Sequence, residues 1–451
     1  MRRRDFLKKT SQSAGLFAGA TFLSRLSFSH TQNANERVNI GIIGCGGRGR
    51  YLARFFAEQG AHITHLCDLH PERLEQMWQF LSDSQSQKSI LTTNMQNVFD
   101  AKDVDAVVIA TPDHWHALAT IRACQAGKDV YVEKPHAHNI LESRKMLEAQ
   151  QKFNRIVQVG TQSRSAPYIH AALAYLRSGE LGGIHLVKVY NLKPGKPFYL
   201  GDPGEPPSGF DWDAWLGPAP LRPYHQDIFS NFGWHQFWDF SGGDLADDAA
   251  HQIDLAMMLM QQQQLPAAVS CSGGRLAHKN DDSQVPDLQI ATFDFDNFVM
   301  VLEHSNYPRY MQKTTGTIRR NDEFPYWTQN ATRIELYGSD LLMIVGRHGG
   351  GWITMTSGGT VVDKMYGRPS DEPHVANFLE CIKSRKKPIA DLETVHASCC
   401  LLHMANIAYR VGNRKLFYDA QTGMFDRDDA NGLLGRDYRK GYDVAKKETK
   451  P

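Results

Sequence analysis

The sequence predicts an α/β protein in which a doubly wound parallel sheet is followed by a second, mostly antiparallel open sheet. The first observation is an apolar run at 38–43 that leads directly into a Gly-x-Gly-x-x-Gly turn. The second is the alternation of apolar runs and helical patterns that continues to about residue 160. The third is a change after that point, where strand patterns follow one another across short turn segments.

The glycine turn indicates a bound dinucleotide. Gly44 permits the tight turn, Gly46 lets the backbone approach the phosphates, and Gly49 lets the next helix pack closely on the strand. Gly47 and Arg48 complete the turn, and the helix that follows directs its free N–H groups and positive dipole end at the pyrophosphate.

An acidic residue at the end of the second strand indicates the type of nucleotide. The apolar run at 63–67 ends at Asp68, at the spacing where a carboxylate accepts hydrogen bonds from the adenosine ribose. That carboxylate would repel a 2′-phosphate, so NAD is predicted in preference to NADP, although Leu69 and His70 do not forbid NADP. The alternative is a surface aspartate that follows an ordinary strand.

Further elements complete the first domain, an NAD-binding Rossmann domain expected over 36–160. Its remaining strands and helices are expected at 105–112, 117–127, 129–133, 141–151 and 156–159.

The second half, 161–420, is expected to be an α+β domain that binds substrate and forms oligomers, followed by a C-terminal tail at 421–451. The segment 194–223 is rich in Pro, Gly and Asp and predicts a long loop with a role at a site mouth. The strands are expected at 185–191, 267–272, 288–295, 298–304, 332–337 and 341–345, and the helices at 375–384 and 396–411.

Composition excludes several classes of function. A formal net charge of +1 gives no bulk electrostatic attraction to nucleic acid or to an anionic membrane. Seven scattered cysteines, with no Cys-x-x-Cys pair, predict neither a disulfide framework nor a zinc site, and no metal is expected. The adjacent Cys399 and Cys400 are expected to fill a buried helix face.

Residues 1–30 resemble a twin-arginine export signal. A twin arginine among Arg2, Arg3 and Arg4 precedes Phe-Leu-Lys, and the apolar stretch 14–23 is too short to span a bilayer. The expected partner is the twin-arginine export machinery, and the expected location is the periplasm or beyond. A cytosolic protein with a basic amphipathic N-terminus is the alternative.

The signal has no Ala-x-Ala cleavage site, although Ser27 and Ser29 are small enough to serve, and a retained anchor stays open. Twin-arginine substrates are typically folded before they cross the membrane and can carry a cytoplasmic ligand. Because the periplasm has no known NAD pool, such an enzyme is expected to keep its nucleotide bound and to regenerate it within each cycle.

Three motifs in order make the chain resemble the Gfo/Idh/MocA family over about residues 36–418. They are the glycine turn, Glu133-Lys134-Pro135, and Asp247-x-x-x-His251. The resemblance implies that Lys134, Asp247 and His251 surround the reacting hydroxyl beside the nicotinamide.

Oxidation of an alcohol removes a hydride from carbon and a proton from oxygen, so a base and a hydrogen-bond donor are both useful. His251 is the predicted base and Lys134 the predicted donor. Asp247, four residues earlier on one helix face, is expected to orient the imidazole or to bind another hydroxyl. The alternative is a helix cap beside an incidental histidine.

The segment Thr111–His116 closes the preceding strand at the same sheet edge. The resemblance implies that His116 lies near the cofactor ribose and nicotinamide, and we group it with the cofactor-binding residues Thr111, Pro112, Glu133 and Lys134. Trp115 is expected either to stack on a ligand or to fill the core.

Aromatic residues favour a carbohydrate substrate. Trp212, Trp234 and Trp238 combine flat apolar faces with neighbouring polar groups, and they precede the segment that holds Asp247. The alternative is that these rings only pack the loop onto the sheet.

Three functions compete. The first is a sugar or cyclitol oxidoreductase with tightly held NAD, which oxidises a ring hydroxyl and passes the hydride to another carbonyl. The second is an NAD-dependent glycoside hydrolase that works through a transient 3-keto intermediate, although the enzymes of this kind replace the lysine that this chain retains as Lys134. The third is a non-catalytic binding protein, which intact Lys134, Asp247 and His251 oppose. A homo-oligomer formed through the second sheet is expected from the resemblance.

Overall fold

The computed structural model describes residues 37–230 and 232–444. The expected export signal at 1–30 lies outside these ranges. Among the described residues, no helix is both long enough and apolar enough to cross a membrane.

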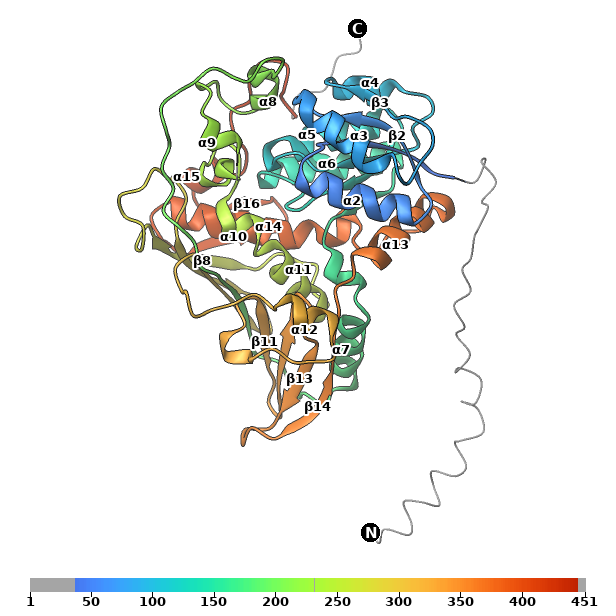
Figure 1. Cartoon of the computed structure of the whole chain (residues 1–451). Coiled ribbons are helices and arrows are strands. Elements are labelled where there is room, and N and C mark those ends of the chain that lie inside the picture. The colour runs from blue at the N-terminus through green and yellow to red at the C-terminus, as the bar shows by residue number, and fades with distance from the viewer. Residues whose placement is uncertain (1–36, 231, 445–451) are drawn as a thin grey trace, which may run out of the picture. The chain divides into compact units, whose positions relative to one another are not determined.

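The first sheet has six parallel strands in the order β3-β2-β1-β4-β5-β6, the order of a doubly wound dinucleotide-binding fold (Figure 1). Its strands are β1 (Asn39–Ile43), β2 (His62–Cys67), β3 (Ile90–Thr92), β4 (Ala106–Ile109), β5 (Asp129–Val132) and β6 (Val157–Val159). Its helices are α2 (Gly47–Glu58), α3 (Pro71–Leu81), α4 (Met95–Asp100), α5 (Asp113–Gln125) and α6 (Ile140–Phe153).

The central strands of this sheet are buried on both faces. All four residues of β4 and of β5 are buried, as expected where helices cover both sides of a parallel sheet. The carboxyl ends of β1, β4 and β5 therefore meet at one edge, where the glycine turn, Thr111 and Glu133 follow.

The second sheet has ten strands in the order β14-β13-β12-β11-β7-β10-β9-β8-β15-β16, and every neighbouring pair is antiparallel except β7 with β10. Its strands are β7 (Leu186–Leu192), β8 (Ala268–Gly274), β9 (Leu288–Asp294), β10 (Val299–Ser305), β11 (Arg333–Tyr337), β12 (Leu342–Gly346), β13 (Trp352–Met355), β14 (Val361–Met365), β15 (Leu416–Asp419) and β16 (Met424–Phe425).

The helices of the second half are α7 (Pro167–Ser178), α8 (Trp212–Leu216), α9 (Gln226–Phe229), α10 (Gly243–Asp247), α11 (Ala250–Leu259), α12 (Gly316–Arg320), α13 (Asp371–Ser384), α14 (Leu392–Arg410) and α15 (Asp428–Asn431). Three short 3-10 turns accompany them: η2 (Gln162–Ser165), η3 (Gly233–Gln236) and η4 (Trp327–Gln329). Helix α14 packs against both β8 and α6 and so joins the two sheets (Figure 1).

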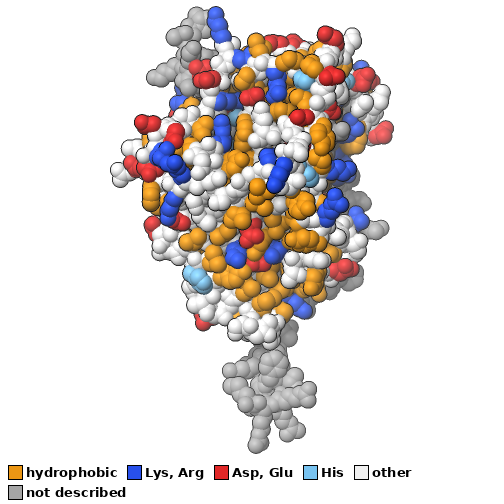
Figure 2. Space-filling view, turned by 90° about the vertical axis from the view of Figure 1, so that its left-hand side faces the viewer, with side chains coloured by type: hydrophobic (Ala, Val, Ile, Leu, Met, Phe, Trp, Pro, Cys, Tyr) orange, Lys and Arg blue, Asp and Glu red, His pale blue; other side chains and the backbone are white. Residues whose placement is uncertain are grey.

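One face of the ten-stranded sheet is left partly open. Side chains alternate along β9 and β10, so that Ile290 and Val299 are exposed while their neighbours are buried. Figure 2, which looks at the left-hand side of Figure 1, shows hydrophobic side chains gathered over the lower part of that side.

The C-terminal segments complete the core of the first sheet. Phe378 of α13 packs in a cluster with residues of β1 and β2, and Leu392 and Val395 of α14 pack with residues of β4. Within 421–444, expected to be a tail, Arg436 forms an ion pair of 2.8 Å with the buried Glu142 of α6.

The structure confirms the predicted fold class, a doubly wound parallel sheet followed by a mostly antiparallel one. The sequence patterns missed the helices α3, α4, α7 to α9, α12 and α15 and the strands β3 and β13 to β16, and α8 lies within the segment expected to be a loop. All seven cysteines are buried and free of disulfides.

Candidate active site

The glycine turn has the geometry that a dinucleotide needs. Gly44 has a φ of +95°, and a Cβ there would lie 2.5 Å from the Ala110 carbonyl oxygen. A Cβ on Gly49 would lie 1.9 Å from the Gly44 carbonyl oxygen, so the packing of α2 on β1 excludes any side chain. At Gly46 the nearest atom to a Cβ is 3.9 Å away and at Gly47 none lies within 4 Å, so open space remains on the ligand side of the turn.

Asp68 stabilises the turn from β2. One carboxylate oxygen accepts a 2.8 Å hydrogen bond from the Cys45 N–H, and the other accepts one of 2.8 Å from the His70 N–H. Burial raises the pKa of Asp68, and these two donors oppose that shift. Each oxygen keeps a lone pair, so the carboxylate can still accept from a ribose hydroxyl.

Arg48 and Glu133 form an ion pair across the edge of the first sheet. The Arg48 Nε lies 2.7 Å from Glu133 Oε1, and its Nη1 lies 3.5 Å from Asp371 of α13. Thr111, after β4, has a buried hydroxyl oxygen without a hydrogen-bond partner. An orphaned donor beside the open space at the turn fits a bound nucleotide.

Lys134 and Asp247 form the central ion pair of the site. The Lys134 ammonium contacts Asp247 Oδ1 and also donates a hydrogen bond of 3.1 Å to the Asp247 carbonyl oxygen. Burial alone would lower the pKa of Lys134, but the charges of Asp247 and Glu133 outweigh it and raise that pKa. Burial alone would raise the pKa of Asp247, but the charge of Lys134 outweighs burial and lowers that pKa to about 2. The pair is therefore ionised at neutral pH.

His251 lies beside this pair as a neutral base. Its ring Nδ1 is buried without a hydrogen-bond partner. Burial, then the charges of Arg347 and Lys134, hold the pKa of His251 well below its ordinary value. The expected single helix is wrong, because α10 ends at Asp247 and α11 begins at Ala250. Asp247 bonds Lys134 rather than the imidazole.

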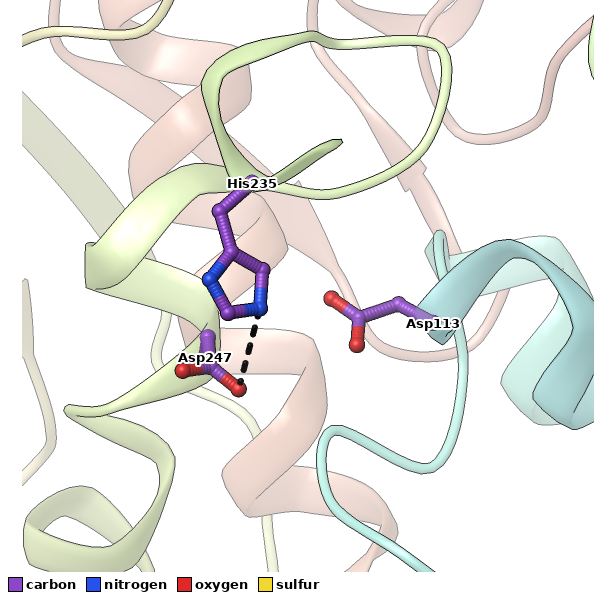
Figure 3. A group of neighbouring side chains, drawn as sticks. All are labelled: Asp113, His235 and Asp247. Atoms are coloured by element: carbon purple, nitrogen blue, oxygen red, sulfur yellow. Dashed lines mark ion pairs between the residues drawn. The ribbon is translucent and has the colours of Figure 1, made fainter. Parts of the chain in front are cut away.

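The structure adds two residues that sequence reasoning did not assign, Asp113 and His235. A ligand-type atom of each lies within 4.8 Å of the other and of Asp247, and Figure 3 shows the Asp113 carboxyl group pointing toward the His235 ring. The His235 Nε2 lies 3.8 Å from Asp247 Oδ1 and has no hydrogen-bond partner. Asp113 begins α5, after the short loop that follows β4, and that position near the carboxyl end of a strand is the signal that could have found it. His235 offers no comparable signal.

These three side chains are donors that a divalent metal accepts, but the local charges oppose an ion. The Lys134 ammonium already occupies Asp247. Burial, then the charge of Asp247, raises the pKa of Asp113 well above its ordinary value, which favours a protonated carboxyl group. This carboxyl group accepts a hydrogen bond of 2.7 Å from the Ser241 hydroxyl. The group is better suited to exchange protons and hydrogen bonds with hydroxyls, and the absence of a metal stays a prediction.

His116 lies at the same edge but holds the protein backbone. Its Nδ1 lies 2.7 Å from the Pro135 carbonyl oxygen and its Nε2 lies 2.8 Å from the Thr111 carbonyl oxygen. Each ring nitrogen faces a carbonyl oxygen, the neutral ring donates its one N–H to one of them, and the ring thereby links the loop after β4 to the loop after β5. Trp115 fills the core, with its N–H donating 2.9 Å to the Trp215 carbonyl oxygen.

The three predicted substrate tryptophans lie in different surroundings. Trp212 stacks on Trp215 at 4.6 Å and donates to the Arg222 carbonyl oxygen, so it packs the loop. Trp238 lies under the guanidinium of Arg410 of α14. Only Trp234 contacts a residue of the site, with its ring 3.8 Å from that of His235.

Comparison with known sequences decides the family. The family description "Oxidoreductase family, NAD-binding Rossmann fold" matches residues 38–161, and its "C-terminal alpha/beta domain" matches 200–321 and 340–444. The chain belongs to the Gfo/Idh/MocA family. The glycine turn, Lys134, Asp247 and His251 all lie within the matched ranges.

Members of the Gfo/Idh/MocA family with different activities are similar to the chain. A scyllo-inositol 2-dehydrogenase (NAD(+)) of Bacillus subtilis is 24% identical over 363 residues, 78% of this chain and 89% of that protein. A glycosyl hydrolase family 109 protein of Solibacter usitatus is 37% identical over 153 residues, 31% of this chain and 34% of that protein. The chain spans 60% or less of the length of several curated relatives that it matches.

A solved structure confirms the fold of the family. The WlbA dehydrogenase from Bordetella pertussis, in complex with NADH and UDP-GlcNAcA, superposes with a TM-score of 0.61. The match covers 85% of this chain and 99% of that one at 18% identity, which supports the fold alone.

Proposed function

We propose that the protein is an NAD-dependent oxidoreductase that acts on a ring hydroxyl of a sugar, glycoside or cyclitol. The observation that carries this proposal is the ammonium of Lys134, fixed by Asp247 at the carboxyl end of β5 beside His251, whose buried Nδ1 has no hydrogen-bond partner among the described residues. The similarity to a scyllo-inositol 2-dehydrogenase supports a polyhydroxylated ring as the substrate class.

The protonation states fit the roles. Neutral His251 can accept the hydroxyl proton at the ring nitrogen that carries a lone pair. Its buried Nδ1 has no hydrogen-bond partner among the described residues. Charged Lys134 donates a hydrogen bond to the same oxygen and stabilises the negative charge that develops as the proton leaves. Asp247 keeps Lys134 charged and directs it, because it binds the ammonium through both a side-chain and a main-chain oxygen.

The residues of the first sheet fit a nicotinamide dinucleotide. The pyrophosphate would lie over Gly46 and Gly47 at the start of α2, and Asp68 would accept from the adenosine ribose, which favours NAD over NADP. When bound, the nucleotide supplies a hydride acceptor that returns the hydride to a carbonyl compound. Thr111 offers its orphaned hydroxyl at the same edge.

The test is mass spectrometry of products after incubation of the purified protein, without added nucleotide, with free sugars, cyclitols and methyl glycosides. A keto product lacking two hydrogens, lost in Lys134→Met and kept in a Lys102→Met control at an exposed lysine, supports the proposal. Unchanged substrates with wild-type protein that carries NAD would contradict it.

A second candidate is redox-neutral glycoside cleavage through a transient 3-keto sugar. Asp113 and His235 favour it, because elimination needs a second acid and base besides Lys134 and His251 to move the C2 proton and to protonate the departing aglycone. The similarity to a glycosyl hydrolase family 109 protein supports it over a third of the chain. Free aglycone with an unoxidised sugar would identify this reaction.

Three further proposals concern the setting of the reaction. The twin arginine near the N-terminus supports export by the twin-arginine machinery, and export supports a nucleotide that stays bound and is recycled. The exposed Ile290 and Val299 on the open sheet face support a homo-oligomer. Fractionation of the native host and measurement of solution mass test these proposals.

A further inference from the structure

Arg347 is a buried cation without a counterion. It directly follows β12, is 7% exposed, and its one side-chain hydrogen bond joins Nη1 to the Nδ1 of His348 at 2.6 Å. Its Nε is buried without a partner. Among the described residues, no carboxylate oxygen lies within ion-pair distance of its guanidinium. Burial of a charge without a counterion costs folding free energy, and a bound anion would offset that cost.

A second arginine adds to the excess of positive charge. Arg319 of α12 donates its Nε to the Thr314 carbonyl oxygen at 2.8 Å and forms no ion pair with a described residue. Burial and, to a smaller extent, the charge of Arg319 lower the pKa of Arg347 to about 10, although the charge of Asp248 opposes this shift. The charge of Arg319 therefore acts on Arg347 in the repulsive sense.

The carboxylates in reach are already engaged. Asp248 lies 3.3 Å from the ammonium of Lys193 and 2.8 Å from that of Lys313. Asp371 lies 3.5 Å from Arg48. Neither of these carboxylates lies within ion-pair distance of Arg347 or Arg319.

The unpaired charge of Arg347 acts on His251 from the second sheet. Arg347 stands at the end of β12, in register with the start of β11, at the sheet edge where β7 also ends. After burial, Arg347 has the largest effect on the pKa of His251, ahead of Lys134. The positive charges of Lys134, from the first sheet, and of Arg347, from the second, therefore both favour the neutral form of the His251 imidazole.

We propose that Arg347 and Arg319 form an oxyanion subsite that binds an anionic substituent of the sugar substrate, a carboxylate or a sulfate. A planar guanidinium matches the two oxygens of such a group, and the unpartnered Nε of Arg347 supplies one donor. The subsite rests on the proposed function for its sugar, and it narrows the substrate class to acidic sugars.

The test compares matched pairs of probes on the purified protein with its bound nucleotide. The pairs are methyl glucuronide with methyl glucoside, methyl galacturonide with methyl galactoside, and glucose 6-sulfate with glucose. Binding is measured by titration calorimetry, and reduction of the nucleotide by absorbance. We expect the anionic member of at least one pair to bind about tenfold or more tightly, the difference that one charge-assisted hydrogen bond supplies.

The variants assign that preference to the arginines. Arg347→Met and Arg319→Met are expected to abolish it, and Arg347→Lys to restore part of it, because an ammonium keeps the charge but loses the planar fork. Arg320→Met, at the exposed neighbour of Arg319 on α12, is the matched control and should keep the full preference. Thermal unfolding confirms that each variant folds.

Three outcomes decide between the alternatives. Equal binding of neutral and acidic sugars by the wild type would overturn the subsite. Purification of Arg347→Met without nucleotide, detected by mass spectrometry, would assign the arginines to the dinucleotide phosphates and also overturn it. Tight, Arg347-dependent binding of acidic sugars without any reduction of nucleotide would support the subsite and contradict the proposed oxidation.

Discussion

The cations that the two sheets bring toward the site differ in whether they are paired. On the side of the first sheet, Lys134 is matched by Asp247 and Arg48 by Glu133. On the side of the second sheet, Arg347 and Arg319 lack a carboxylate partner among the described residues. An ion pair holds a catalytic group in one place and in one protonation state. A buried charge without a counterion instead gains free energy when it binds an anionic ligand.

Loss of Lys134 is expected to have the largest effect. Lys134→Met should lower the rate of nucleotide reduction by about 10³-fold, because the developing alkoxide loses its donor. It should also lower stability by about 3 kcal/mol, since buried Asp247 is left without its partner. Arg347→Met removes a cation that has no partner, so its unfolding temperature should not fall. Single-turnover kinetics and thermal unfolding measure both effects, and equal destabilisation by the two variants would remove the contrast.

The glycine turn offers the next largest effect. Gly49→Ala should destabilise the protein by about 3 kcal/mol, because its Cβ would meet the Gly44 carbonyl oxygen at 1.9 Å. Gly46→Ala has open space around its Cβ and should leave stability within about 0.5 kcal/mol while it lowers the retention of nucleotide. Denaturation curves and the quantity of nucleotide released on unfolding separate the two. A strongly destabilised Gly46→Ala would show that the space there is not kept for a ligand.

Asp68 should have a smaller effect, confined to the nucleotide. Asp68→Asn keeps an oxygen for the Cys45 N–H but removes the charge that would repel a 2′-phosphate. We expect NAD to bind about tenfold more weakly, and the ratio of NAD to NADP affinity to move toward NADP. Competition binding with both nucleotides checks this, and an unchanged ratio would place the adenosine ribose away from Asp68.

The dependence of rate on pH should be the smallest effect. The pKa of His251 lies well below its ordinary value, that of Lys134 is raised, and that of Asp247 is about 2. As the pH falls, His251 stays neutral until the pH passes through its lowered pKa, and Lys134 stays charged as the pH rises. Between about pH 6.5 and 9, kcat/KM should therefore change by less than about twofold. An ionisation inside that window would place a different group at the reacting oxygen.

The nucleotide half of the site was predictable because its residues sit on short segments with fixed local geometry. Gly44 and Asp68 each follow a strand of the first sheet directly, Gly49 lies in the first turn of the helix after β1, and Lys134 is the second residue after β5. A strand end at the edge of a parallel sheet fixes the position of the next few residues. Sequence spacing therefore carries most of the information there.

The substrate half was not predictable in the same way. His235 reaches the site from a long loop segment, and Arg347 from a turn between two antiparallel strands, more than 200 residues after Lys134. The missed β14 is fully exposed and has no apolar alternation, so no period-2 signal exists along it. The sequence also did not predict that the helix is interrupted at Asp248 and Ala249. Because of this interruption Asp247 pairs with Lys134 and not with His251.

The return of the C-terminal helices to the first sheet has a consequence for synthesis on the ribosome. The six strands of the first sheet are complete at Val159, yet Phe378, Leu392 and Val395 arrive only in the last quarter of the chain. Until then the apolar faces that these side chains cover stay open, and the nascent first domain is a target for chaperones. The packing of the first sheet is thus completed late in translation, although the glycine turn lies among the first fifty residues.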